Sequence, residues 1–374
     1  MLSEETMRQS APQQNEILDP KNPFENPMEN REYRMDYRRV LPQILLPGFQ
    51  VPFAPEREER RAIRKSLNIA GLGILLSDLI SQLLAFGLMF LVTWVLQMRY
   101  HMEWNTASDY LSNSSILIAI NGLIFFTINT ATACIGCKSM RIPLRSLFQT
   151  QDFTWKSALK YIPIGIGLQC VAAYLYTALS WFLEQGGLSG VDADFSYFSS
   201  GKSVLMTILY TCILAPLTEE LLYRGFLMKT LSRVSIRFGI LISALAFGLA
   251  HGNPAQFLLG FLVGIFMGKI DTRHNSLLPS ILVHIAINST SMAIELIGEL
   301  VPSLWENYVN FGLNLIYLGV AAIGILFWFC FECRKPLPYN TQKQAMRNRV
   351  AWTAPCLLIA LAFQIGMLLA FGLQ

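Results

Sequence analysis

Charged residues are scarce in this chain, and their scarcity is the first clue to its class. Only 14% of the 374 residues are Asp, Glu, Lys or Arg, whereas 53% are hydrophobic. Soluble domains carry about 25% charged residues, so the composition argues against a soluble globular protein. The sequence also lacks a basic patch with interleaved aromatic residues. We therefore expect no nucleic-acid partner.

The N-terminus lacks the basic start and apolar core of a signal peptide, so none is predicted. Residues 1–66 instead hold 11 of the 29 Lys and Arg and 11 of the 25 Asp and Glu. This stretch is rich in Asn, Gln, Pro and Glu, a composition typical of disorder. Its apolar patch at 40–53 is broken by three prolines and cannot span a bilayer. We predict a disordered cytoplasmic tail over 1–66.

Long apolar runs make up most of the remaining chain. A helix of about 20 residues crosses the hydrocarbon core of a membrane, and helices satisfy their own backbone groups in lipid. The sequence therefore predicts an all-α polytopic membrane protein with about eight to nine transmembrane helices. The runs lie near 69–98, 113–136, 158–183, 203–230, 236–253, 255–270, 276–300, 308–332 and 351–373. The run at 255–270 is short enough to be re-entrant.

Basic residues flank alternate ends of these runs. If the N-terminal tail is cytoplasmic, the inner flanks collect nearly all of them, and the outer loops keep only Arg99 and Lys202. Lys and Arg accumulate on the cytoplasmic side of membrane proteins. We therefore predict an N-terminus inside the cell.

Cysteines number seven, and four of them form two close pairs, Cys134 with Cys137 and Cys330 with Cys333. Both pairs fall at the inner ends of predicted helices, where a reducing cytoplasm argues against structural disulfides. Together they could bind zinc through four thiolates, or each pair could be redox-active. We favour the simpler interpretation, small adaptable residues at helix ends.

Ionisable residues inside apolar spans are functional candidates by default. In the segment PLTEELLYRGF (216–226), Glu220 and Arg224 are four residues apart, acid first, so they share a helical face and can pair. Glu219 is rotated by about 100° and remains a candidate general base. The alternative is a helix end with solvated charges at the inner interface. Asp78 and Glu295 are isolated, and we interpret them as a packing residue and a residue near the outer interface.

Two of the four histidines also lie in apolar runs. His251 ends the segment FGLAH, and His284 and Asn288 are four residues apart in HIAIN, so they share one helical face. A lone helical histidine is usually a hydrogen-bonded packing residue. Two of them with an amide and a free carboxylate supply a base, a proton carrier and oxyanion donors. The set predicts hydrolytic chemistry.

Three motifs follow one another on successive predicted helices: E-E-x-x-x-R, F-x-x-x-H and H-x-x-x-N. In this order they resemble the CPBP intramembrane protease family, whose members are similar to type II CAAX prenyl endopeptidases. The resemblance covers roughly residues 200–295. It implies that Glu220 and Arg224 brace the first helix of the site.

The resemblance also implies catalytic roles. Glu219 and His251 would activate the attacking water, and His284 and Asn288 would stabilise the tetrahedral oxyanion. The family is commonly labelled metalloprotease, and Glu219, His251 and His284 could supply three zinc ligands. However, the chain has no His-Glu-x-x-His helix, and a glutamate-activated water needs no metal. We favour a mechanism that requires no cofactor.

Straight helices would keep these residues apart. At 1.5 Å per residue, His251 would lie on the order of 10 Å further out than Glu219 and His284. That separation is too large for a shared water, which needs hydrogen-bond reach to each residue.

The predicted organisation is a tail over 1–66, transmembrane helices over 67–199, a protease-like core over 200–295 and further helices over 296–374. The favoured function is an intramembrane endopeptidase of a bacterial plasma membrane. Its partners would be the lipid bilayer and a membrane-associated peptide or protein substrate. One alternative is a non-catalytic scaffold or bacteriocin-immunity-type protein that retains the motifs. Another is a transporter with a polar relay, although the chain shows no internal repeat.

Overall fold

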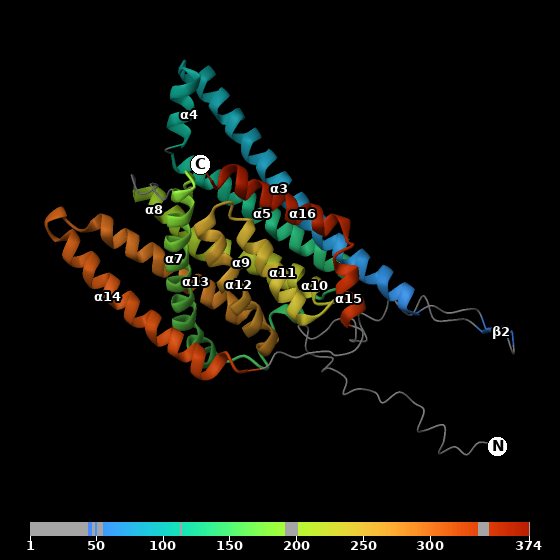
Figure 1. Ribbon diagram of the computed structural model, residues 1–374. Coiled ribbons are helices and arrows are strands. Elements are labelled where there is room, and N and C mark those ends of the chain that lie inside the picture. The colour runs from blue at the N-terminus through green and yellow to red at the C-terminus, as the bar shows by residue number, and fades with distance from the viewer. Residues whose placement is uncertain are drawn as a thin grey trace.

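The computed structural model describes residues 44–46, 49–50, 55–112, 114–190, 201–335 and 344–373, and these are mostly helical (Figure 1). Two short strands, β1 (Ile44–Leu46) and β2 (Phe49–Gln50), pair antiparallel. Helix α3 begins at Pro55, so the last part of the predicted tail is helical. The tail residues 1–43, 47–48 and 51–54 lie outside the described residues.

The described part of the chain forms a series of helices. In chain order they are α3 (Pro55–Tyr100), α4 (Trp104–Ser112), α5 (Ser115–Met140), η1 (Leu144–Leu147), α6 (Trp155–Leu159), α7 (Tyr161–Gln185), α8 (Gly201–Ile208), η3 (Leu209–Leu214), α9 (Ala215–Glu220), η4 (Leu221–Met228), α10 (Lys229–Leu231), α11 (Ile236–Leu249), α12 (Pro254–His274), α13 (Leu278–Leu300), α14 (Ser303–Phe327), η5 (Trp328–Glu332), α15 (Gln344–Ala351) and α16 (Pro355–Phe371).

Among the described residues, seven helical stretches are long and apolar enough to cross a membrane. They are Arg60–Tyr100, Ile116–Met140, Tyr161–Gln185, Val204–Leu231, Pro254–His274, Leu278–Gly298 and Leu304–Glu332. Two shorter apolar helices, α11 and α16, account for the other two predicted runs. The protein is therefore a polytopic all-α membrane protein, as the apolar runs predicted.

Two predicted helix lengths need correction. The run at 255–270 is no short re-entrant segment, because α12 is a continuous helix of 21 residues. The run at 236–253 yields only the 14 residues of α11, which ends at Leu249. Asn253 then caps α12, its side-chain oxygen accepting from the backbone N–H of Gln256. Such an N-cap starts a new helix, so the chain turns just after His251.

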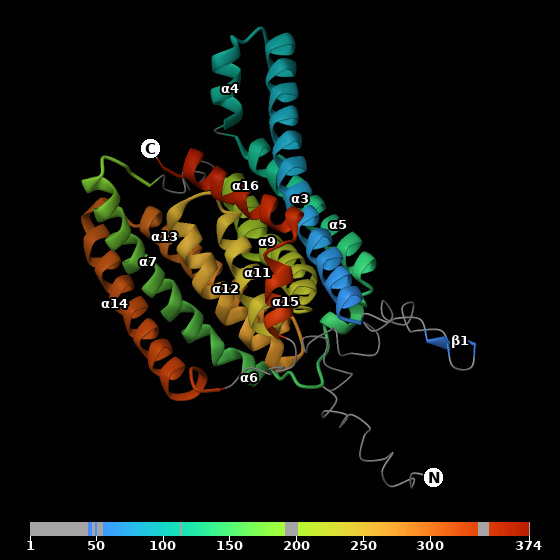
Figure 2. The ribbon, with the colours of Figure 1, turned by 45° about the vertical axis from the view of Figure 1, so that its right-hand side comes forward.

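Helices α11 and α12 pack against each other in the middle of the bundle (Figure 2). On one side α7, which packs against α14, contacts α12, and on the other side α3 contacts both α5 and α16. Half of the residues in an 18-residue apolar segment of α12 are buried, compared with 11% in the corresponding segments of the α3 and α14 spans. The outer helices therefore present apolar faces to lipid, while α12 lies in the protein interior.

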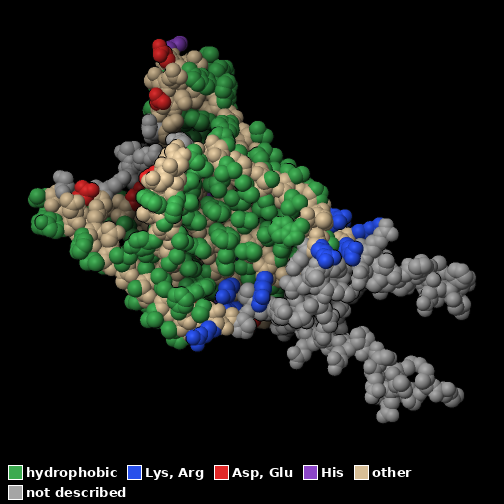
Figure 3. All heavy atoms as spheres, in the orientation of Figure 1, with side chains coloured by type: hydrophobic (Ala, Val, Ile, Leu, Met, Phe, Trp, Pro, Cys, Tyr) green, Lys and Arg blue, Asp and Glu red, His purple; other side chains and the backbone are tan. Residues whose placement is uncertain are grey.

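Charged side chains gather at the ends of the molecule, as the face in Figure 3 shows. Lys and Arg side chains lie along its lower right edge, and the visible acids lie towards the upper and left ends. Hydrophobic side chains cover most of the surface between them. This distribution fits a protein whose middle zone faces hydrocarbon.

Candidate active site

The helical stretch from α8 to α10 carries two adjacent carboxylates on different faces. It is continuous through residues 201–231, but the turns η3 and η4 are wider π turns on either side of α9. π turns inside α-helices are rare and occur frequently at functional sites. They flank the segment in which Glu219 and Glu220 lie.

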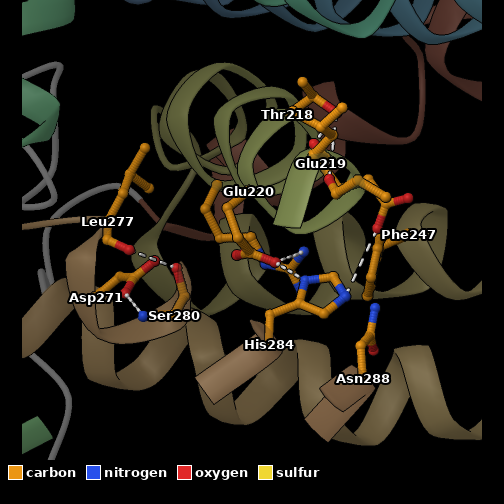
Figure 4. Close-up of polar contacts among 12 residues, drawn as sticks. Thr218, Glu219, Glu220, Phe247, Asp271, Leu277, Ser280, His284 and Asn288 are labelled. Atoms are coloured by element: carbon orange, nitrogen blue, oxygen red, sulfur yellow. Dashed lines mark hydrogen bonds and ion pairs between the residues drawn. The ribbon is translucent and has the colours of Figure 1, made fainter. Parts of the chain in front are cut away.

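Glu220 is fully buried and accepts two hydrogen bonds on the same oxygen (Figure 4). Arg224 Nη1 donates to Glu220 Oε1 at 3.1 Å, and His284 Nδ1 lies 2.8 Å from the same atom. The predicted i,i+4 pair therefore forms, with both side chains 0% exposed. The pair also holds the imidazole of His284, which lies on α13.

Arg224 also contacts the ring of Phe247 and passes close to α12. Its guanidinium carbon lies 4.2 Å from the centroid of the Phe247 ring, a favourable cation–π geometry. On α12, a Cβ added to Gly264 would lie 3.0 Å from Arg224 Nη2. Glycine at this position therefore leaves room for the guanidinium to pass close to α12.

Phe247 organises the aromatic side of the site. Its ring centroid lies 5.1 Å from that of Tyr223, 5.0 Å from His251 and 5.7 Å from His284. Its backbone carbonyl lies 2.8 Å from His251 Nδ1. A carbonyl oxygen only accepts hydrogen bonds, so this contact places the proton of neutral His251 on Nδ1. The lone pair on Nε2 then remains available.

Glu219 lies on the other face of the helix. Its side chain is 21% exposed, and its Oε2 lies 3.7 Å from His284 Nε2. His284 therefore lies between two carboxylates, with one near each ring nitrogen (Figure 4). The Glu220 contact at 2.8 Å is a hydrogen bond, whereas the Glu219 contact at 3.7 Å is only an ion-pair distance.

Asn288 follows His284 by one turn of α13, and its Nδ2 donates to the carbonyl of Thr211 at 2.9 Å. The local sequence explains why that carbonyl is free. The N–H of Ala215 bonds to Tyr210 in the π turn, and the N–H that would follow belongs to Pro216, which has none. The proline thus leaves an acceptor that fixes the amide of Asn288.

A cavity of about 390 Å³ brings the predicted catalytic residues together. Glu219, His251, His284 and Asn288 all line it. Glu219 and His251 therefore line the same space, despite the axial offset predicted from straight helices. Glu295, which we placed near the outer interface, also lines this cavity.

Two further buried residues, Asp271 and Ser280, lie behind the site and were not singled out in the sequence. Asp271 on α12 is fully buried, and its Oδ1 accepts from the backbone N–H of Ser280 at 3.0 Å. Its Oδ2, like Oε2 of Glu220, has no hydrogen-bond partner among the described residues. In the sequence, Asp271 is followed closely by Arg273, so it resembles an ordinary interfacial charge.

The predicted metal ligands do not form a metal-binding group. Among the described residues, no group of three or more His, Cys, Asp or Glu side chains is placed to hold a metal ion. Glu219, His251 and His284 therefore do not form a three-ligand set in this conformation. Each histidine uses Nδ1 in a hydrogen bond, so Nε2 is the ring nitrogen that could bind a metal. All seven cysteines are free thiols.

Comparison with known proteins shows a similarity over the segment that contains the site. Residues 201–290 match the family model described as Type II CAAX prenyl endopeptidase Rce1-like. The resemblance predicted from the three motifs is confirmed over this segment. Within the polytopic membrane protein defined by the fold, this matched segment contains every residue of the predicted site.

One curated relative matches a similar fraction of the chain. The UPF0177 protein YxdF of Lactococcus lactis subsp. lactis (strain IL1403) is 31% identical over 77 residues. The alignment covers 20% of this chain and 42% of the relative's length. No solved structure matches the chain.

Proposed function

We propose that this protein is an intramembrane endopeptidase that hydrolyses a peptide bond in a membrane-associated protein or peptide. One observation carries the proposal. Glu219, His251, His284 and Asn288 line a single cavity inside a bundle of apolar helices. A site that combines hydrogen-bond acceptors and donors around one space suits attack by water on a carbonyl group.

The acceptor side consists of Glu219 and His251. The Glu219 carboxylate is partly exposed to the cavity, and the bond to the Phe247 carbonyl leaves the Nε2 lone pair of His251 available. Two acceptors hold a water molecule through its two hydrogens. Glu219 takes one of these protons as the water oxygen attacks the peptide carbon, which is general-base catalysis.

The donor side consists of His284 and Asn288. The contact with Glu220 orients the His284 ring so that Nε2 faces the cavity. Asn288 uses one amide hydrogen for Thr211 and has a second hydrogen to donate. In the proposed mechanism the Nε2–H of His284 and the second amide hydrogen of Asn288 stabilise the oxyanion that forms on the peptide oxygen. As the C–N bond breaks, the proton held by Glu219 passes to the leaving amine.

No step of this mechanism requires a cofactor. Zinc would supply Lewis-acid activation of the water if it were bound. Glu219, His251 and His284 would be its ligands, although their arrangement does not fit that role. The resistance of activity to a chelator tests this assignment.

We also propose that the protein lies in a bacterial plasma membrane with its N-terminus in the cytoplasm. The segregation of Lys and Arg towards one end supports this orientation (Figure 3). Residues 200–295 would form the catalytic core, flanked by accessory helices over 67–199 and 296–374.

The experiment is cleavage of membrane-anchored peptides by the purified protein in liposomes. Wild type is compared with Glu219→Gln and with Glu103→Gln, which makes the same change at an exposed acid of the α3–α4 connection. We expect cleavage by wild type and Glu103→Gln, with or without chelator, and none by Glu219→Gln. Equal cleavage by all three would contradict the proposal. Absence of cleavage by every version across the peptide panel would favour a non-catalytic scaffold.

A further inference from the structure

A second cavity, of about 310 Å³, meets the catalytic one at the candidate general base. It is lined from α3, α5 and α16, helices outside the matched segment. The two cavities share a wall of five residues: Tyr210, Glu219, Phe247, His251 and Gln256. Glu219 and His251 therefore border both spaces.

Polar side chains from three helices converge on the second cavity. One face of α3 contributes four of these side chains, Ser77, Asp78, Ser81 and Gln82. Their spacing places them on the same side of the helix. Asn129 from α5 and Gln364 from α16 complete the polar wall. These helices otherwise lie at the apolar periphery of the bundle. Polar residues inside membrane spans pair with one another or line water-filled space.

Hydrogen bonds among these side chains satisfy only some of their polar groups. Gln364 Nε2 donates to Asp78 Oδ2 at 2.9 Å and ties α16 to α3. The other end of the amide, Gln364 Oε1, is buried and has no hydrogen-bond partner among the described residues. Buried polar groups without protein partners are commonly satisfied by ordered water.

Apolar side chains line both cavities, Phe125, Phe363 and Met367 in the second one, but they form a larger part of the catalytic cavity. Between its polar residues run apolar side chains of α12 and α13: Leu259, Val263, Met267, Ile287 and Met292. This space suits the apolar part of a membrane substrate. A bound substrate would displace water from it, so the hydrolytic water would need a path from the other side of Glu219.

We propose that the second cavity is a water chamber that supplies the hydrolytic water to Glu219 and His251. The inference rests on the proposed protease function, to which it adds the route of a reactant. The volume accommodates several molecules, since liquid water occupies about 30 Å³ per molecule. The chamber contributes only water: one molecule enters the reaction for each peptide bond that becomes a carboxylate and an amine.

Cysteine labelling tests whether the chamber is wet. Ser81→Cys in the full chain is treated with a charged methanethiosulfonate, which reacts with thiolates formed in contact with water. The control is Leu83→Cys on the exposed side of α3, which faces lipid, and wild type gives the background of the seven native cysteines. We expect Ser81→Cys to be labelled at least tenfold faster than Leu83→Cys. Equally slow labelling would overturn the proposal.

Kinetics test whether this water is the reactant. Asn129→Leu keeps the branched shape of the side chain and Ser81→Ala removes only the hydroxyl, so each removes a polar group, and thermal unfolding verifies that each variant folds. We expect kcat to fall about tenfold with KM unchanged, because substrate does not occupy the chamber. A raised KM would make the second cavity a substrate subsite and overturn the proposal, as would an unchanged kcat. If wild type cleaves no peptide, the proposed function fails, and the labelling result still decides whether the chamber holds water.

Discussion

The two faces of the 201–231 helix place neighbouring carboxylates in opposite environments. Glu220 is 0% exposed and is bonded to Arg224 and His284, whereas the Glu219 side chain is 21% exposed and lines both cavities. A buried charge persists only where partners compensate its lost hydration. A general base must reach its water. One residue step along the helix thus separates an acid that builds the site from an acid that can act in it.

Removing the carboxylate on the cavity face should have the largest effect. Glu219→Gln keeps the shape of the side chain but removes the proton acceptor. We expect the cleavage rate to fall by about 10²- to 10⁴-fold, the usual contribution of a general base. Purified protein in liposomes provides the measurement. Unchanged thermal unfolding would show that the loss is catalytic, and a rate within a few fold of wild type would contradict the role of Glu219.

Removing the carboxylate on the packed face should instead affect stability. Glu220→Leu leaves Arg224 as an uncompensated charge in the interior, and breaking a buried pair in this way costs about 3–5 kcal/mol. Reversible unfolding in mixed micelles measures the difference. The double variant Glu220→Leu with Arg224→Met should recover part of the loss, since it removes both charges. A single variant as stable as wild type would show that the pair is not structural.

Removing one proposed oxyanion donor should reduce catalysis by a smaller factor. Asn288→Ala deletes the amide that Thr211 holds in place. Loss of a single donor of this kind lowers kcat by about 10²- to 10³-fold. Steady-state kinetics should show the fall in kcat with little change in KM. A change in KM alone would assign Asn288 to substrate binding.

Adding a methyl group at Gly264, behind the site, should have the smallest effect. In Gly264→Ala the added Cβ would lie 3.0 Å from Arg224 Nη2 and from the Cβ of Ala244. The guanidinium has little room to move, because Glu220 and Phe247 hold it. Overpacking of this kind costs about 1–3 kcal/mol. Gly312→Ala on α14 is the matched control, since its Cβ would meet nothing within 4 Å, and it should not lower the unfolding temperature.

The sequence predicts the features that depend on local spacing. Apolar run length gives the membrane helices, and four-residue spacing gives the pair of Glu220 with Arg224. The same four-residue spacing places His284 and Asn288 on one face of their helix. These features follow from helix geometry alone.

The remaining features depend on packing between distant segments. The partner of Asp78 is Gln364, which lies 286 positions away, so no local pattern points to it. The role of Pro216 in freeing the Thr211 carbonyl depends on a π turn, which spacing does not predict. The offset predicted for His251 assumed straight helices, whereas α11 ends early and the chain turns into α12.

The central claim is that Glu219 acts on water while Glu220 holds the site together. The most direct test is the cleavage rate per folded molecule of Glu219→Gln in liposomes, measured beside wild type and Glu103→Gln. Our account predicts a folded protein that unfolds at the wild-type temperature and does not cleave, while Glu103→Gln cleaves normally. Cleavage by folded Glu219→Gln at the wild-type rate would contradict it.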